Sequence, residues 1–340
     1  MLKSQLGKVS TAKRLFSHLP DMSGSASNLV KAGLYNIKPK AWKSPEISHL
    51  PVSYTIYINT ICNYRCSFCF LITDQHKGDK GKNISLKKFK AIVEHPQNRF
   101  ASRVTIGGGE PMLHPKVFEF IKILKDLNKV VSIYTNGSLI HRNMDKTLNS
   151  DLDYLNISHY DDKFSDIQDS IAEFLSKKTR PITRLSKILT NSSLGDMEKV
   201  LSLAMEINFD SVIFQNYYAE YERDSEHVIH SSNTEFHEEK ARLIKKYRNI
   251  EIIWPNLHHP DSEFNCQNIS LNATYDSDGN QAPCCFQVPP ARSYGNIFKD
   301  ADSCNTKEMI RLRVAYQTGT KEANFCKNCY FRCGLGNRYR

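Results

Sequence analysis

Three cysteines with close, regular spacing are the part of this chain best suited to chemistry. Cys62, Cys66 and Cys69 follow the pattern Cys-x3-Cys-x2-Cys, and the aromatic residue Phe68 comes directly before the last of them. Residues 54–59 are rich in β-branched and aromatic side chains and predict a strand, which places the cysteines on the loop that leaves its end. Because thiolates are metal ligands, three of them in one short loop can hold a single metal centre.

The number of cysteine ligands in the loop limits which kind of metal centre it can hold. A structural zinc ion normally takes four protein ligands, and the loop has no fourth cysteine or histidine at the usual spacing. A disulfide would use two of the cysteines and leave the third over. A 4Fe–4S cluster prefers thiolates, and with three of them it keeps one iron open for another ligand. We therefore expect such a cluster, with a zinc site or an incidental grouping as the alternative.

A glycine-rich turn follows the second predicted strand. Residues 106–111 read Ile-Gly-Gly-Gly-Glu-Pro. Consecutive glycines let the backbone approach a ligand closely, although an ordinary strand-to-helix turn can look the same. Polar residues also lie at or near the ends of later predicted strands, where parallel α/β folds gather their ligands. These residues are Asn136, Ser158, Arg184 and Gln215, and for each of them a capping or turn role is the alternative.

The remaining seven cysteines lie in residues 266–333, and this change in cysteine usage indicates a second, C-terminal module. They are Cys266, Cys284, Cys285, Cys304, Cys326, Cys329 and Cys333. Clustered cysteines in a chain without a secretory signal indicate metal binding in a reducing compartment, so we expect a cytoplasmic protein. No apolar run reaches the roughly 18 residues of a membrane span, so no transmembrane segment is expected.

Strands and helices alternate in the predicted core. The predicted strands cover residues 54–59, 103–106, 130–134, 154–158, 182–190 and 211–215, separated by helices near 86–94, 116–127, 139–149, 165–176 and 195–207. Such βα units form a parallel sheet, and six of them are too few for a closed eight-stranded barrel. We expect an α/β fold: a partial (β/α)6, TIM-like barrel over residues 51–217. A connecting segment of residues 218–263 and a small iron–sulfur domain of residues 264–340 should follow it.

The three-cysteine loop, with its aromatic residue and preceding strand, resembles the signature of the radical S-adenosylmethionine (radical SAM) superfamily. The partial barrel is also the core fold of that family, and Gly108, Gly109 and Glu110 match its Gly-Gly-Glu motif. The resemblance implies that the open iron binds the amino and carboxylate groups of S-adenosylmethionine and that the Gly-Gly-Glu turn contacts its amino group. It further implies that Asn136 and Ser158 contact the ribose and carboxylate, and that Arg184 neutralises the carboxylate.

The C-terminal cysteines resemble the SPASM module of radical SAM enzymes, in its shortened version with one auxiliary 4Fe–4S cluster. This resemblance implies four ligands, Cys266, Cys284, Cys326 and Cys329, with Cys333 able to replace Cys329. Cys285 and Cys304 are then spare thiols in a packed interior. A zinc site with four cysteine ligands is the alternative for the whole module.

The resemblance implies an enzyme that cleaves S-adenosylmethionine to a 5′-deoxyadenosyl radical, which takes a hydrogen atom from its substrate. Oxidation of a small sugar or cyclitol is the expected reaction, and cross-linking, epimerisation or maturation of a ribosomally made peptide is the alternative. A flavodoxin or ferredoxin is the expected electron donor.

Charge is concentrated at the N-terminus. The net charge is +10, and residues 1–50 hold eight Lys or Arg against two acidic residues, which makes them a basic arm. Such an arm can meet an anionic partner. A non-enzymatic iron–sulfur or zinc protein that binds nucleic acid through the arm is therefore a third hypothesis. The glycine turn beside the cysteine loop argues against it, so we do not expect nucleic acid as a partner.

Overall fold

A computed structural model of the chain describes residues 22–37, 43–69, 71, 81–219, 222–259, 266–288, 293–318, 325–326 and 328–333. The first 21 residues of the predicted basic arm lie outside them. The helices are α2 (Met22–Ile37), α3 (Leu86–Val93), α4 (Val117–Asp126), α5 (Met144–Leu148), α6 (Gln168–Lys177), α7 (Met197–Glu206), α8 (Thr234–Lys246), α9 (Asn268–Leu271) and α10 (Lys307–Thr318). No helix in these ranges is both long and apolar enough to cross a bilayer.

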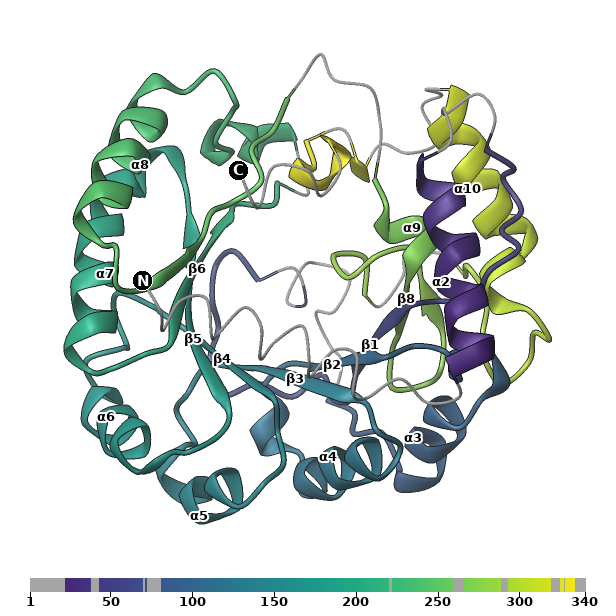
Figure 1. The fold of residues 1–340 in the computed structure, drawn as a ribbon, viewed down its shortest axis with the longest axis horizontal. Coiled ribbons are helices and arrows are strands. Elements are labelled where there is room, and N and C mark those ends of the chain that lie inside the picture. Colours follow the sequence, from purple (N-terminus) through teal and green to yellow (C-terminus); the bar gives the residue numbers. More distant parts are fainter. Residues whose placement is uncertain are drawn as a thin grey trace.

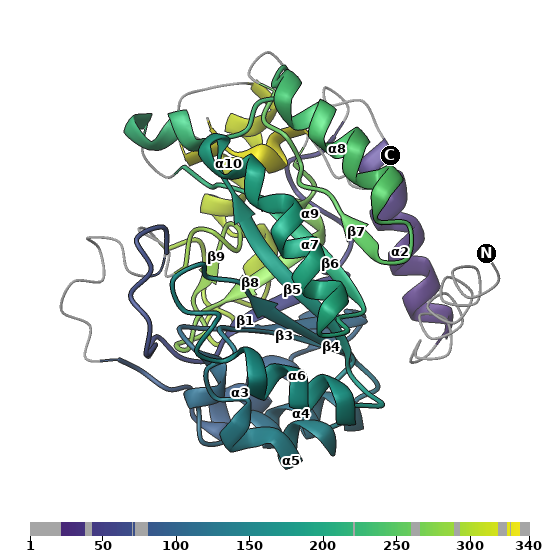
Figure 2. The same cartoon turned by 90° about the vertical axis from the view of Figure 1, so that its left-hand side faces the viewer.

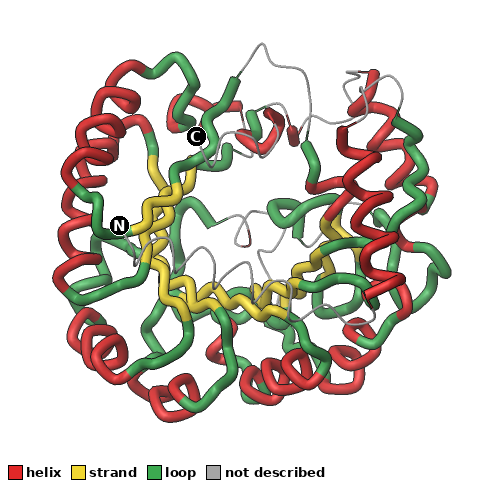
Figure 3. Tube along the Cα trace, in the orientation of Figure 1, coloured by secondary structure: helices red, strands yellow, loops and turns green. Residues whose placement is uncertain are grey.

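The described strands form one curved sheet of nine strands in the order β7-β6-β5-β4-β3-β2-β1-β8-β9. They are β1 (Ser53–Tyr57), β2 (Arg103–Gly107), β3 (Val130–Thr135), β4 (Tyr154–Ser158), β5 (Ile182–Leu189), β6 (Ser211–Asn216), β7 (Glu251–Ile253), β8 (Asn272–Tyr275) and β9 (Gln281–Ala282). All neighbours pair in parallel except β8 and β9. The sheet bends into an arc with helices around its outside (Figures 1 and 3). The predicted partial barrel is confirmed.

The sheet extends beyond the predicted core at both ends. β7 comes from the segment expected to be a connection, and it pairs with β6. β8 comes from the expected C-terminal domain, and it pairs with β1. The C-terminal module therefore shares the sheet of the barrel.

Alternation along the strands separates two faces. Val131, Ile133, Leu155 and Ile157 belong to the apolar core between sheet and helices. The helices meet it with apolar stripes, for example Val117, Phe120, Ile121 and Leu124 of α4. Figure 2 shows α7 and α8 covering the side of the sheet at β5 to β7. Since successive strand residues point to opposite faces, Ser132, Asn156 and Ser158 face the inside of the arc. The inner wall is therefore polar.

Candidate functional site

The three-cysteine loop leaves the sheet at the carboxyl end of β1 and returns to it before α3. Its two stems pair with each other: the amide of Ile84 donates to the carbonyl of Ile58 at 2.8 Å, and that of Thr60 to the carbonyl of Lys82 at 3.0 Å. Ser85 then caps α3, its hydroxyl accepting from the amide of Lys88. The loop is thus anchored to the sheet at both ends.

The glycine turn after β2 packs directly on this loop. The amide of Gly109 donates to the carbonyl of Asn59 at 3.0 Å, and the amide of Glu110 to the carbonyl of Ile61 at 2.7 Å. A Cβ on Gly109 would lie 2.2 Å from the carbonyl oxygen of Ile61, and one on Gly108 would lie 2.1 Å from Oδ1 of Asn59. The two glycines therefore permit a close approach between the turn and the chain just before Cys62.

Glu110 joins the ends of β2 and β3. Its carboxylate accepts hydrogen bonds from the Thr135 hydroxyl at 2.7 Å and from the amides of Met112 at 2.9 Å and Asn136 at 2.7 Å. The side chain is only 1% exposed. Burial raises the pKa of this carboxyl group, and the three donors oppose the rise. All of these described contacts are within the chain, and the expected contact of Glu110 with S-adenosylmethionine stays a prediction.

Asn136, at the end of β3, reaches the cysteine loop. Its amide nitrogen Nδ2 lies 2.9 Å from Oδ1 of Asn63 and 3.9 Å from the sulfur of Cys62. Its Oδ1 accepts from both the amide and the hydroxyl of Ser138. The structure therefore brings together three stretches that the sequence had singled out separately: the cysteine loop, the glycine turn and the end of β3.

Tyr160 is a second residue that holds the loop, and the sequence did not predict it. Burial raises the pKa of its phenol, and Cys66 and Ser158 lie close enough to modify that pKa. Its ring stacks on Phe68, with the ring centroids 5.8 Å apart. Burial raises the pKa of the Cys66 thiol, whereas the hydrogen bond with Tyr160 lowers it. The signal in the sequence that could have indicated Tyr160 is its position two residues after Ser158, the serine that ends β4.

A pocket of about 340 Å³ opens beside Phe68 at the carboxyl ends of β3 to β6. The predicted residues Ser158 and Gln215 line it, together with Tyr134, Ser186 and Ile188. Its wall also contains an ion pair between Lys187 and Asp161, with His159 close to Asp161. The sequence alone did not indicate these charged residues, because only the register of β5 beside β4 brings them together.

Arg184 lies on the inner wall but outside the lining of this pocket. Its guanidinium carbon is 4.2 Å from the ring centroid of Tyr154, the first residue of β4. Arg184 is the register partner of Asn156 in β4 and Ser211 in β6. Within the described structure, Nε of Arg184, Oδ1 of Asn156 and Oγ of Ser211 are buried without a hydrogen-bond partner. The inner wall can therefore accept a polar ligand, and the carboxylate role of Arg184 stays a prediction.

Four C-terminal cysteines come together from distant positions. Burial raises the pKa of Cys284 and of Cys329. Among the neighbouring thiols, Cys285 and Cys266 raise both values further, and Cys326 raises that of Cys329. Cys285, predicted to be spare, therefore also adjoins the group. Cys304 lies elsewhere, with its sulfur 2.9 Å from Nε2 of Gln97. Cys333 ends a short helix, and its side chain lies outside the described residues.

Both donor sets consist of thiols, the ligands that iron–sulfur clusters prefer. Within the described ranges, no three Cys, His, Asp or Glu side chains lie close enough to share one metal ion. The buried C-terminal thiols raise one another's pKa, and a cationic centre would let them ionise together. By the chemistry of their donors, the residues present suit iron–sulfur clusters.

The sequence of the chain is similar to a protein-family model and to several curated proteins. Residues 56–159 match the model of the Radical SAM superfamily. GTP 3′,8-cyclase of Alkaliphilus oremlandii is 30% identical over 139 residues, which are 39% of this chain and 40% of that protein. The chain covers about half or less of the length of the curated relatives that it matches.

Solved structures share the fold. Streptococcus suis SuiB bound to precursor peptide SuiA is similar with a TM-score of 0.64 and 17% identity, over 85% of this chain and 70% of that one. AnSMEcpe with bound AdoMet and Kp18Cys peptide gives 0.60 and 18%, over 83% and 88% of the two chains. The superfamily implies a 4Fe–4S cluster and S-adenosylmethionine as cofactors. Residues 56–159 of the chain therefore match the radical SAM superfamily, and its curated relatives include enzymes.

Proposed function

We propose that the chain cleaves S-adenosylmethionine reductively and thereby removes a hydrogen atom from a C–H bond of its substrate. The observation that carries this proposal is the direct contact of the three-cysteine loop with the glycine turn after β2 and with Asn136 after β3. Ligands of α/β folds bind at the carboxyl ends of the strands, and this contact lies there.

The chain's own residues would hold and orient the reactants. Cys62, Cys66 and Cys69 would ligate the first cluster, while Asn136 and Tyr160 fix the loop around Cys62 and Cys66. When bound, the cluster and S-adenosylmethionine supply the one-electron chemistry, and an external flavodoxin or ferredoxin supplies the electron.

The pocket beside Phe68 and Ser158 would take the adenosyl part of S-adenosylmethionine. Asn136 would contact the cofactor from the end of β3. On the inner wall, Nε of Arg184 is a donor without a described partner, which supports its proposed pairing with the carboxylate. Gly108, Gly109 and Glu110 would act chiefly by holding the cysteine loop against the turn.

The C-terminal module would hold a second cluster, with Cys266, Cys284, Cys326 and Cys329 as ligands. A cluster with four thiolates has no open iron, so its natural role would be to accept one electron from the substrate radical, which is thereby oxidised. The grouping of these four thiols supports the proposal.

A peptide is the first candidate substrate. SuiB was solved with its precursor peptide and anSMEcpe with Kp18Cys peptide, and the shared fold extends over most of this chain. A sugar or cyclitol is the second candidate, because the C-terminal thiols would hold one auxiliary cluster, as in the shortened module that the sequence resembles.

The decisive experiment replaces Cys62, Cys66 and Cys69 together by Ala and measures 5′-deoxyadenosine in dithionite-reduced, reconstituted protein. We expect the product to disappear and roughly four irons to be lost. Cys304→Ala is the matched control, because that thiol lies away from both groups, and it should keep full activity and iron. Product formation by the triple variant would contradict the proposal.

The second cluster is tested by Cys284→Ala. It should lower the iron content by roughly four atoms while cleavage of S-adenosylmethionine survives. Wild-type protein with one cluster and one zinc ion would exclude the role of electron acceptor.

A further inference from the structure

Tyr57, the last residue of β1, lies between the two cysteine groups. Its hydroxyl donates to the carbonyl of Cys285 at 2.8 Å, next to Cys284 in the chain. Burial raises the pKa of this phenol, and the nearby thiols of Cys285, Cys284 and Cys69 raise it further. One side chain thus borders both sites, and it precedes the first stem of the cysteine loop by a single residue.

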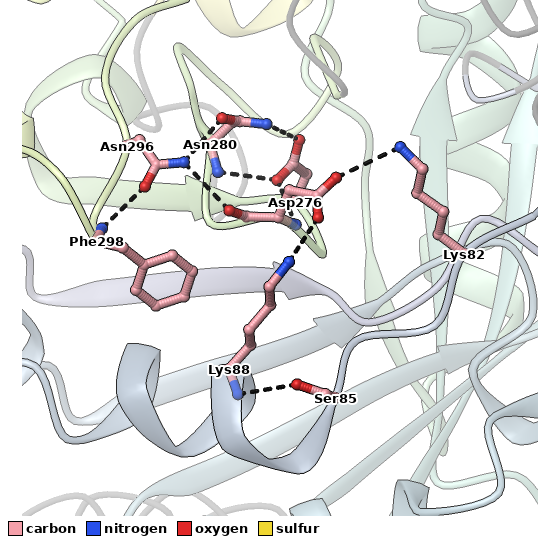
Figure 4. A network of polar contacts seen from close by, with 8 residues as sticks. Lys82, Ser85, Lys88, Asp276, Asn280, Asn296 and Phe298 are labelled. Carbon is pink, nitrogen blue, oxygen red and sulfur yellow. Dashed lines mark hydrogen bonds and ion pairs between the residues drawn. The ribbon is translucent and has the colours of Figure 1, made fainter.

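The second stem also contacts the C-terminal module. The β8–β9 turn presents Asp278, whose carboxylate lies 3.4 Å from Nζ of Lys82 and 2.7 Å from Nζ of Lys88. Lys82 ends the loop and Lys88 lies in the first turn of α3, so the turn meets both elements (Figure 4). The module therefore touches the cysteine loop at both of its ends.

The turn that presents Asp278 is itself rigidly built. The carboxylate of Asp276 accepts from the amides of Asp278 and Asn280, and Nδ2 of Asn296 donates to the carbonyl of Asp278 (Figure 4). Gly279 has φ of +78°, a conformation that favours glycine. Movement of this turn would therefore be passed on to Lys82 and Lys88.

The ion pairs of Asp278 and the hydrogen bond of Tyr57 differ in strength. The side chains of Lys82, Lys88 and Asp278 are 59%, 46% and 44% exposed, so water and salt weaken their ion pairs. Tyr57 is only 9% exposed, so its hydrogen bond lies in a lower local dielectric than the two ion pairs. We therefore expect the Tyr57 contact to contribute more to the coupling than the ion pairs do.

We propose that Tyr57 is a positioning residue that couples the two cysteine groups, so that a seated C-terminal module holds the three-cysteine loop in its binding geometry. Through the backbone of Cys285, a disturbance at Cys284 reaches the loop that carries Cys62, Cys66 and Cys69. This inference rests on the proposed function only for the identity of the groups bound at the two sites.

The test is a double-mutant cycle in reconstituted full-length protein, with Tyr57→Phe and Cys284→Ala alone and combined. The dissociation constant of S-adenosylmethionine and the electron paramagnetic resonance signal of the first cluster on its addition are measured. Cys284→Ala should weaken binding roughly two- to tenfold when Tyr57 is present, the range expected of one hydrogen bond. In the Tyr57→Phe protein, adding Cys284→Ala should not weaken the binding of S-adenosylmethionine any further. Independent, multiplying effects would overturn the coupling.

A second readout needs no cofactor. Amide exchange in the metal-free chain should be faster at Thr60 and Ile84, the donors of the stem, in Tyr57→Phe than in wild type. Tyr35→Phe is the matched control, since that hydroxyl donates to the carbonyl of Ser44 outside both sites. Asp278→Asn should also speed amide exchange at Thr60 and Ile84, but by less than Tyr57→Phe does.

The two readouts separate the two proposals. If wild-type protein fails to bind S-adenosylmethionine but Tyr57→Phe speeds exchange at the stem, the proposed function is wrong and the coupling stands. If wild type binds the cofactor and Tyr57→Phe changes neither exchange nor affinity, the coupling is wrong and the proposed function stands.

Discussion

At the scale of single residues, the site depends on a missing Cβ as well as on the side chains that are present. The turn after β2 can touch the cysteine loop only because Gly109 has no Cβ. The sequence predicted the three cysteines and the Gly-Gly-Glu run, since their spacing is local. It could not predict Tyr57 or Tyr160, because their contacts join strand ends that only the folded barrel brings together.

The first prediction concerns Gly109→Ala. The added carbon would meet the carbonyl of Ile61, a backbone atom that cannot turn aside, so the loop must move. We expect loss of roughly four irons from the first site, with the C-terminal iron retained. Iron analysis and the visible spectrum measure this.

Gly195→Ala is the control for this prediction. A Cβ at Gly195 would have no atom within 4 Å, so iron should be unchanged and stability equal or slightly higher. Full iron in Gly109→Ala would show that turn and loop can separate easily.

At the scale of elements, hydrophobic periodicity gave the six core strands and their helices, because each alternates or repeats within its own length. The joining of β8 to β1 had no such signal, since it depends on residues 219 positions apart, such as Ser53 and Asn272.

Buried polar groups hold the connections between neighbouring strands in place. Lys129, just before β3, donates to the carbonyls of Arg99 at 3.0 Å and Ala101 at 2.7 Å.

The second prediction follows from the burial of Lys129, which lowers its pKa to about 8. In the unfolded chain the value is about 10.4. Between these two pH values the unfolded chain binds more protons, so the free energy of unfolding should rise with pH across this window.

The expected rise is on the order of 3 kcal/mol. Comparing urea unfolding of wild type with that of Lys129→Met at several pH values isolates this group, since other titrating residues are common to both. Equal slopes in the two proteins would contradict the prediction.

At the scale of the whole molecule, the N-terminal segment and the C-terminal module are tied together. The Arg313 guanidinium in α10, 2% exposed, donates to the carbonyls of Pro45, Ile269 and Cys304. Asn305 also bonds the backbone of Ile47. The described part of the predicted basic arm therefore packs on the C-terminal module. Composition gave the charge of the arm, and packing alone decides where it lies.

The third prediction is that Arg313→Met destabilises the chain by at least about 3 kcal/mol, since it leaves several buried carbonyl groups without a donor. Urea unfolding measures the loss, and residues 43–50 should become accessible to proteases. Arg311→Met is the control, because this residue of the same helix forms an exposed pair with Glu308. It should change stability by about 0.5 kcal/mol or less, and an equal loss in both variants would contradict the role of Arg313.

The pairing of β8 with β1 has a consequence for synthesis. β1 is made early, and its partner on one side follows 219 positions later, so at usual ribosome speeds that edge waits roughly 10 to 40 seconds for β8. During this time its backbone donors and acceptors can pair with another nascent chain. Fragments that stop before Asn272 never receive β8, and we expect them to aggregate even though they contain the whole of residues 56–159.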